Sequence, residues 1–224
     1  MKKIGLITIG QAPRTDIMED LWPMLSDAFE IYQRGALDGL SETELAALAP
    51  EPGNTVLVSS LLNGTAVTMA EEKILHLLQD CIGDLERKGV CAIMFLCTGD
   101  FKDNLKAEVP LIYPNRILAG LIPALCTNSQ LAVLVPEEDQ KEDAVQQWKE
   151  KDINAQVFAV SPYEGDIERF KAAAANIEKT DAACVLMDCM GYSRAMKSQI
   201  AKNCSKPVIL PRSVVAAILK EIYC

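Results

Sequence analysis

Short runs of apolar residues alternate with longer segments of helical spacing along the chain, and this alternation limits the fold more than any other feature. A continuous apolar run of strand length is typical of a strand buried on both faces. Its alternation with helical segments predicts an α/β fold with parallel sheets. The expected strands cover residues 4–9, 29–33, 55–59, 91–97, 131–135, 155–160, 183–189 and 207–210, and the expected helices cover residues 14–26, 41–49, 68–88, 116–126, 137–151, 166–179, 193–203 and 213–223.

Two of the apolar runs end in a cysteine that is followed two residues later by glycine. The first ending is Cys97-Thr98-Gly99, and the second is Cys189-Met190-Gly191. Because the two cysteines lie 92 residues apart and the strand–helix rhythm repeats, the sequence indicates two similar halves. We predict two pseudo-symmetric α/β lobes, residues 1–115 with 212–224 and residues 116–211. Each lobe would hold a short parallel sheet flanked by helices, with a cleft between the lobes.

The charge balance restricts the class of partner. The chain carries 31 acidic and 22 basic residues, which argues against a nucleic acid or an anionic membrane. No apolar run approaches the roughly 18 residues of a membrane span, and the N-terminal run lacks a signal-peptide cleavage pattern. We therefore expect a cytoplasmic protein whose eight cysteines stay reduced. The expected partner is a small anionic or amide substrate, and a homodimer is left open.

Histidine and metal chemistry have little support in this sequence. His76 is the only histidine, and it lies in a helical run where an ordinary helix residue is the simpler interpretation. No cysteine pair or histidine cluster has zinc-ligand spacing, so we expect no metal and no cofactor. An enzyme with this sequence would use thiols, carboxylates, hydroxyls, lysine or arginine as its acid and base groups.

Cys97 and Cys189 are the candidate catalytic pair, with small core residues as the alternative interpretation. Two thiols on opposite sides of a carbon can invert it, because one removes a proton as thiolate while the other delivers a proton to the opposite face. Cys189 is also expected close to a helix N-terminus, which favours a thiolate. The backbone N–H groups around Thr98-Gly99 and Met190-Gly191, with the Thr98 hydroxyl, are candidate donors to the carbanion.

Further substrate contacts are expected in loops that follow strands, because ligands of open α/β sheets bind beyond the carboxyl ends of the strands. Gln11 and Arg14 follow the first strand, where the guanidinium could clamp a carboxylate. Asn63 and Gly64 follow the third strand, although a plain turn is equally consistent with these residues. Arg212 follows the last strand, and a surface position is its alternative.

Several segments together resemble the AroM family, and the resemblance covers the whole chain. They are Leu6-Ile7-Thr8-Ile9-Gly10-Gln11-Ala12-Pro13-Arg14-Thr15-Asp16, Leu61-Leu62-Asn63-Gly64, Phe95-Leu96-Cys97-Thr98 and Leu186-Met187-Asp188-Cys189-Met190-Gly191-Tyr192. The AroM family is similar in turn to the aspartate/glutamate/hydantoin racemase superfamily. This resemblance implies two α/β lobes with one cysteine from each facing a central cleft, Cys97 from the first lobe and Cys189 from the second.

The residues beside the two cysteines differ from those of the amino-acid racemases. Thr98 stands where those enzymes usually have an amide residue, and Met190-Gly191 stands where they often have Thr-Glu. The turn after Cys189 resembles the hydantoin-racemase branch more closely.

We predict a cofactor-independent racemase, epimerase or isomerase that acts on a small carboxylate or cyclic amide. The alternatives are a non-catalytic metabolite-binding protein with the same cleft, and an isomerase or decarboxylase that uses a single cysteine.

Overall fold

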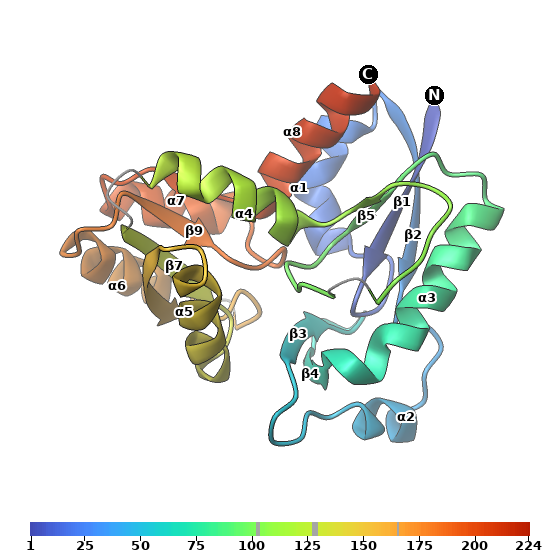
Figure 1. Ribbon diagram of the computed structural model, residues 1–224, viewed down its shortest axis with the longest axis horizontal. Helices are drawn as coiled ribbons and strands as arrows, with labels where there is room; N and C mark the ends of the chain where they lie inside the picture. Colours follow the sequence, from blue (N-terminus) through green and yellow to red (C-terminus); the bar gives the residue numbers. More distant parts are fainter. Residues whose placement is uncertain (102–103, 127–129, 165) are drawn as a thin grey trace. The chain divides into compact units, whose positions relative to one another are not determined.

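The computed structural model describes residues 1–101, 104–126, 130–164 and 166–224. Within it the chain divides into two compact units, residues 1–115 with 216–224 and residues 116–215. Each unit is built on its own parallel sheet flanked by helices, so the predicted α/β class is confirmed (Figure 1). Among the described residues, no helix is both long and apolar enough to cross a membrane.

The sheet of the first unit contains β1 (Lys2–Thr8), β2 (Phe29–Gly35), β5 (Ile93–Phe95) and β6 (Leu111–Ile112), in the order β2-β1-β5-β6. All of its strand pairs are parallel. Figure 1 shows α3 (Glu71–Arg87) on one side of this sheet and α1 (Thr15–Leu25) on the other. The apolar side chains of β1, β5 and α3 form one buried cluster, which explains why β1 is a continuous apolar run.

An antiparallel hairpin is inserted in the first unit and corrects one prediction. β3 (Val56–Ser60) pairs with β4 (Ala66–Ala70) across the turn at residues 61–65. The helix expected over residues 68–88 therefore begins only at Glu71. Alternating residues such as Val67 and Met69 suit a strand with one buried face, and Asn-Gly is a strong hairpin signal.

The short helix α2 (Glu42–Ala47) precedes the hairpin. Ser41 caps it, because the Ser41 hydroxyl accepts from the Glu44 backbone N–H while the Glu44 carboxylate accepts from the Ser41 N–H. This reciprocal pair is a capping box, for which Ser and Glu three residues apart are the usual sequence signal.

The sheet of the second unit contains β7 (Gln130–Val135), β8 (Asn154–Ala159), β9 (Cys184–Met187) and β10 (Val208–Ile209). Read from its β8 edge, the order is β8-β7-β9-β10, again with parallel pairs throughout. Each unit thus places its second strand at one edge, then the first, third and fourth strands of its sheet. The two sheets share one topology, which is the repeat that the sequence rhythm indicated.

Helices cover both faces of the second sheet. α6 (Ile167–Glu178) and α7 (Arg194–Asn203) pack on the face that carries Ala132 and Leu134, while α4 (Pro114–Leu125) and α5 (Lys141–Lys149) pack on the face that carries Leu131 and Val133. Successive residues of a strand point to opposite faces, so both sets must be apolar. The remaining helices of the described chain are the 3₁₀ turn η1 (Glu138–Gln140) and the closing helix α8 (Pro211–Tyr223).

Candidate functional site

Cys97 and Cys189 occupy equivalent positions in the two units. Cys97 follows β5, the third strand of the first sheet, and Cys189 follows β9, the third strand of the second sheet. Both strands lie in the interior of their sheets, and both cysteines come at the carboxyl end. Loops at that end are where open α/β sheets bind ligands.

The two sulfur atoms accept matching backbone hydrogen bonds. The Gly99 N–H donates to Cys97 Sγ at 3.2 Å, and the Gly191 N–H donates to Cys189 Sγ at 3.3 Å. In each case the donor is the glycine two residues after the cysteine. A backbone N–H directed at sulfur stabilises the charged form of a thiol, so the repeated turn is suited to holding a reactive thiolate.

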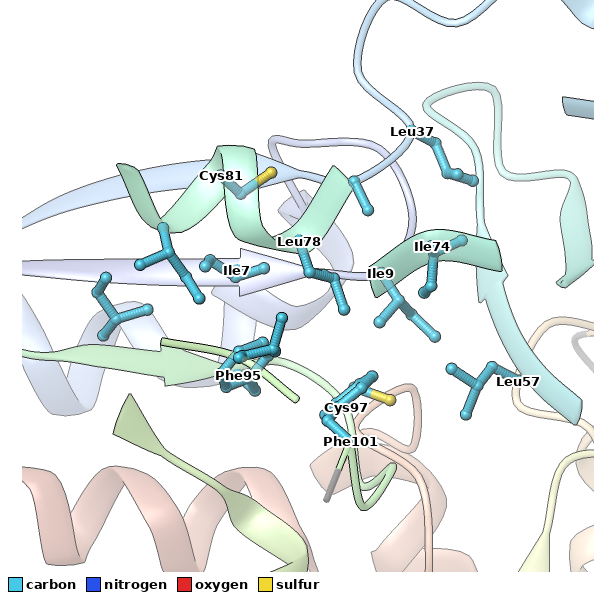
Figure 2. Packing of buried hydrophobic residues seen from close by; sticks show 14 of the residues in the cluster. Ile7, Ile9, Leu37, Leu57, Ile74, Leu78, Cys81, Phe95, Cys97 and Phe101 are labelled. Atoms are coloured by element: carbon cyan, nitrogen blue, oxygen red, sulfur yellow. The ribbon is translucent and has the colours of Figure 1, made fainter. Parts of the chain in front are cut away.

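Cys97 is buried in the apolar cluster of the first unit. Figure 2 shows its side chain beside Phe101, with Leu57 nearby. A methyl group on Gly99 would lie 3.1 Å from the Phe101 ring and 3.4 Å from Cys97 Sγ, so these groups pack closely around the turn. Thr98 and Gly99, which follow Cys97 in the chain, are half-buried.

Cys189 is half-buried and has a phenol as a neighbour. Tyr163 Oη lies 3.8 Å from Cys189 Sγ, and either atom could donate the hydrogen bond. The Tyr163 ring lies over Gly191, where an added methyl group would lie 2.6 Å from Oη. Tyr163 is not among the site residues predicted from the sequence. Its position after β8, at the carboxyl edge of the second sheet, is the signal that could have identified it.

Arg212 holds the turn that carries Cys189. Its guanidinium is buried, and Nε and Nη2 donate to the Met190 carbonyl oxygen at 3.0 and 2.6 Å. The predicted surface alternative is therefore wrong, because the side chain is 1% exposed. The structure places Arg212 together with Met190 and next to Gly191, where it fixes the backbone on which the sulfur and its N–H donor sit.

Arg14 is also buried and is engaged by its own chain. Its Nε and Nη2 donate to both carboxylate oxygens of Asp16 at 2.8 and 2.6 Å, and its Nη1 donates to the hydroxyls of Thr8 and Ser59. Two donor atoms of the guanidinium thus hold the half-exposed Asp16 carboxylate, and the substrate contact of Arg14 stays a prediction.

Gln11, Asn63 and Gly64 form a second group in the first unit. Gln11 Oε1 accepts from the Leu62 N–H at 2.9 Å, which ties the loop after β1 to the hairpin turn. The Asn63 side chain accepts from the Thr65 N–H, and Gly64 has a φ of +84° that favours glycine. Asn63 and Gly64 thus build the turn, in agreement with the turn interpretation.

Carboxylates and phenols surround the turn of Cys189. Burial raises the pKa of the Tyr192 phenol well above its usual value, so its O–H stays protonated and donates to the Val160 carbonyl at 2.8 Å. Partial burial, helped by Glu164, raises the pKa of Glu137. Among the described residues, no group of three or more His, Cys, Asp or Glu side chains is placed to hold a metal ion.

Comparisons with known proteins identify the family and the fold. The family model described as AroM protein matches residues 4–223. No curated protein sequence matches the chain. The chain resembles allantoin racemase from Klebsiella pneumoniae, with a TM-score of 0.66 and 11% identity over 99% of this chain and 87% of the other.

Two further solved structures share the fold. Glutamate racemase from Francisella tularensis subsp. tularensis, in complex with D-glutamate, has a TM-score of 0.63 and 14% identity over 99% of this chain and 80% of the other. An unliganded arylmalonate decarboxylase has a TM-score of 0.61 and 12% identity over 99% and 91%. At such low identity these similarities establish the racemase-like fold.

Proposed function

Because the chain belongs to the AroM protein family and has the fold of the aspartate and glutamate racemases, we propose that it is a cofactor-independent racemase, epimerase or isomerase. Cys97 and Cys189 would be its two acid/base groups. The substrate would be a small carboxylate or a cyclic amide with an acidic C–H bond.

The observation that carries this proposal is the repeated thiol turn. In each sheet a cysteine lies two residues after the end of the third strand, and its sulfur accepts the N–H of the glycine two residues later. The shared strand position together with the directed donor supports a matched role in chemistry for the two thiols. A thiol also titrates close enough to neutrality, at about 8.5 when unperturbed, to act as either acid or base.

The reaction needs one thiolate and one thiol. The thiolate takes the proton from carbon and becomes a thiol, and the electron pair of the broken C–H bond remains as a carbanion. The other thiol then gives its proton to the opposite face of the carbon and becomes a thiolate. Donors beside each sulfur, such as the Thr98 hydroxyl and the neighbouring backbone N–H groups, would stabilise the charge that develops on the adjacent carbonyl.

Solvent-deuterium exchange tests this function. The wild-type protein is incubated in D₂O with a panel of single-enantiomer amino acids, hydantoins and hydroxy acids, and deuterium at carbon is measured by mass spectrometry and NMR. We expect exchange with at least one class, lost in the Cys97→Ala, Cys189→Ala double variant. Cys91→Ala is the matched control, because Cys91 is an ordinary partly buried cysteine before β5. Exchange that survives the double variant would rule out the thiol mechanism.

A single-cysteine isomerase or decarboxylase is the second candidate, suggested by the shared fold with arylmalonate decarboxylase. It predicts that one cysteine variant keeps full activity, and that a malonate-type substrate loses carbon dioxide. A non-catalytic metabolite-binding protein predicts thermal stabilisation by a ligand with no exchange at carbon.

A further inference from the structure

We propose that Tyr163 is a positioning residue for Cys189, and that its O–H donates to the sulfur and holds it as the thiolate that begins the reaction. This inference rests on the proposed function and assigns the starting base of its two-thiol mechanism. It follows from how the loop after β8 meets the turn after β9, both within the second unit.

The phenol oxygen of Tyr163 is a neighbour of the Cys189 sulfur. Tyr163 Oη lies 3.8 Å from Cys189 Sγ, a long contact for a neutral pair. Hydrogen bonds to an ionised acceptor are shorter and roughly twice as strong as neutral ones. A thiolate has no proton to donate, so the phenol must then be the donor, and the contact is expected to shorten when the sulfur becomes charged.

The turn after Cys189 leaves room for the Tyr163 ring. A methyl group on Gly191 would lie 2.6 Å from Tyr163 Oη and 2.9 Å from Cζ, distances that packed atoms do not reach. Glycine at this position leaves room for the phenol, whereas a larger residue would force the Tyr163 ring to shift. The same glycine donates its N–H to Cys189 Sγ at 3.3 Å, so one residue supplies a donor and makes room for the second.

Hydrogen bonds hold both the turn after Cys189 and the loop that carries Tyr163 in place. The buried Arg212 guanidinium donates twice to the Met190 carbonyl, between Cys189 and Gly191 in the chain. Tyr163 is anchored at its own end, where its N–H donates to the Ser161 hydroxyl at 3.4 Å. Fixed donors stabilise a charge without the cost of reorganisation when the proton moves.

The charged groups around the turn make directed donors necessary. Asp188 directly precedes Cys189 in the chain. Glu137, from the loop after β7, contributes to the raised pKa of the Tyr192 phenol, as Cys189 and Asp188 also do. These carboxylates disfavour a negative charge on the Cys189 sulfur, whereas the Arg212 guanidinium favours it. Glu164 is paired with Arg169, which reduces its effect. Since net carboxylate charge disfavours the thiolate, the N–H of Gly191 and the O–H of Tyr163 have to outweigh it.

Cys97 provides the contrast. Its sulfur accepts the Gly99 N–H in the same way, but the side chain is buried within the apolar cluster with Leu57 and Phe101, whereas Cys189 is only half-buried where it packs against the apolar cluster of the second unit (Figure 2). An apolar surrounding disfavours a charged thiol. Cys97 is therefore assigned as the resting proton donor and Cys189 as the resting base, with the two states exchanged after each inversion.

The test is the pH profile of iodoacetamide alkylation at each cysteine, followed by peptide mass spectrometry in the full chain. Tyr163→Phe removes only the hydroxyl and keeps the ring over Gly191. We expect the half-maximal pH for Cys189 to rise by roughly one unit, so that the thiolate fraction at neutral pH falls about tenfold. A more basic thiolate is more nucleophilic, so the alkylation rate itself should fall about three- to fourfold.

Three controls make the result specific. The profile of Cys97 in the same molecules should not move, and Tyr32→Phe, which removes a phenol paired with Glu30 in the first unit, should leave both profiles unchanged. Tyr163→His, which restores a side-chain donor, should recover part of the shift. An unchanged Cys189 profile in Tyr163→Phe would overturn this inference alone. If no substrate exchanges deuterium at carbon, while Tyr163→Phe still shifts the pH profile of Cys189, the proposed function is overturned and the role of Tyr163 beside Cys189 stands.

Discussion

Gly191 and Tyr163 approach each other so closely that a single methyl group on the glycine would lie 2.6 Å from the phenol oxygen. The φ angle of Gly191 lies outside the left-handed region, so the constraint is the space taken by the ring and not the backbone. The equivalent residue Gly99 is less constrained, because its added methyl group would lie 3.1 Å from the Phe101 ring at the closest.

We therefore expect Gly191→Ala to destabilise the protein more than Gly99→Ala. The clash at Gly191 should cost about 1–3 kcal/mol of unfolding free energy, partly offset by the roughly 0.4–1 kcal/mol that alanine contributes by restricting the unfolded chain. At Gly99 the two effects should nearly cancel. Urea denaturation of the two variants measures the difference, and equal losses would contradict the packing described for the Cys189 turn.

Arg212 should be a structural requirement of the same turn. Arg212→Met keeps an apolar stem but removes both donors to the Met190 carbonyl. Because hydrogen bonds to charged groups contribute about 1.5–3 kcal/mol, we expect the free energy of unfolding to fall by about that amount. Arg87→Met is the matched control, because Arg87 is exposed at the end of α3 and should change stability by less than about 0.5 kcal/mol. Denaturation curves that coincide for the two variants would refute the role of Arg212 in holding the turn.

The ion pair of Arg14 with Asp16 leads to a separate prediction. Asp16→Asn leaves the buried guanidinium with a neutral partner, and we expect a loss of about 1–2 kcal/mol, reduced from the fully buried case because the Asp16 side chain is 48% exposed. Glu19→Gln, an exposed change on the same helix, should have little effect. If Arg14 instead serves a substrate carboxylate, Asp16→Asn should tighten substrate binding at small cost in stability.

Alkaline pH should weaken the fold through its buried thiols. Burial, with smaller contributions from Asp38 and Asp84, raises the pKa of Cys81 to about 12, and burial beside Cys126 also raises the pKa of Cys184. The folded state therefore retains protons that the unfolded chain releases above about pH 9, and stability is lost as the pH rises from there toward 12. The slope approaches about 1.4 kcal/mol per pH unit for each such thiol.

Denaturation at about pH 8 and about pH 10 measures this slope. Cys81→Ala should reduce it, whereas Cys224→Ala should not, because Cys224 is exposed at the chain end. A stability that is constant over this interval would show that the buried thiols do not titrate as described.

The apolar runs were sufficient to predict the central strands of both sheets, whereas the two-residue strand β6 was not predicted. A strand buried on both faces leaves a continuous apolar signal, and β1, β5, β7 and β9 are strands of this kind. The capping box of Ser41 with Glu44 was also readable, because it depends on residues three positions apart.

The hairpin strand β4 was missed because its exposed face carries Ala66 and Thr68, and residues 68–70 continue into a strong helical pattern. The helix signal therefore extended too far toward the N-terminus. In the sequence, Asn63 and Gly64 fit a binding loop and a plain turn equally well, and the structure shows that they form the hairpin turn.

Long-range polar contacts could not be predicted from local patterns. Arg14 and Arg212 both follow strands, as expected for ligand-binding residues, yet each is held by groups of its own chain. Tyr163 lies 26 residues from Cys189 in sequence, and no periodicity links them. Such pairings depend on which loops the sheet order brings together.

The most direct measurement of the two-thiol mechanism is exchange from each enantiomer in single-cysteine variants. With a substrate from the exchange panel, the wild-type protein should incorporate deuterium and invert either enantiomer. Cys97→Ser should exchange only the enantiomer whose proton faces Cys189, and Cys189→Ser only the other, neither with net inversion. Equal exchange of both enantiomers by either variant, or inversion that persists in one, would contradict proton transfer by the pair.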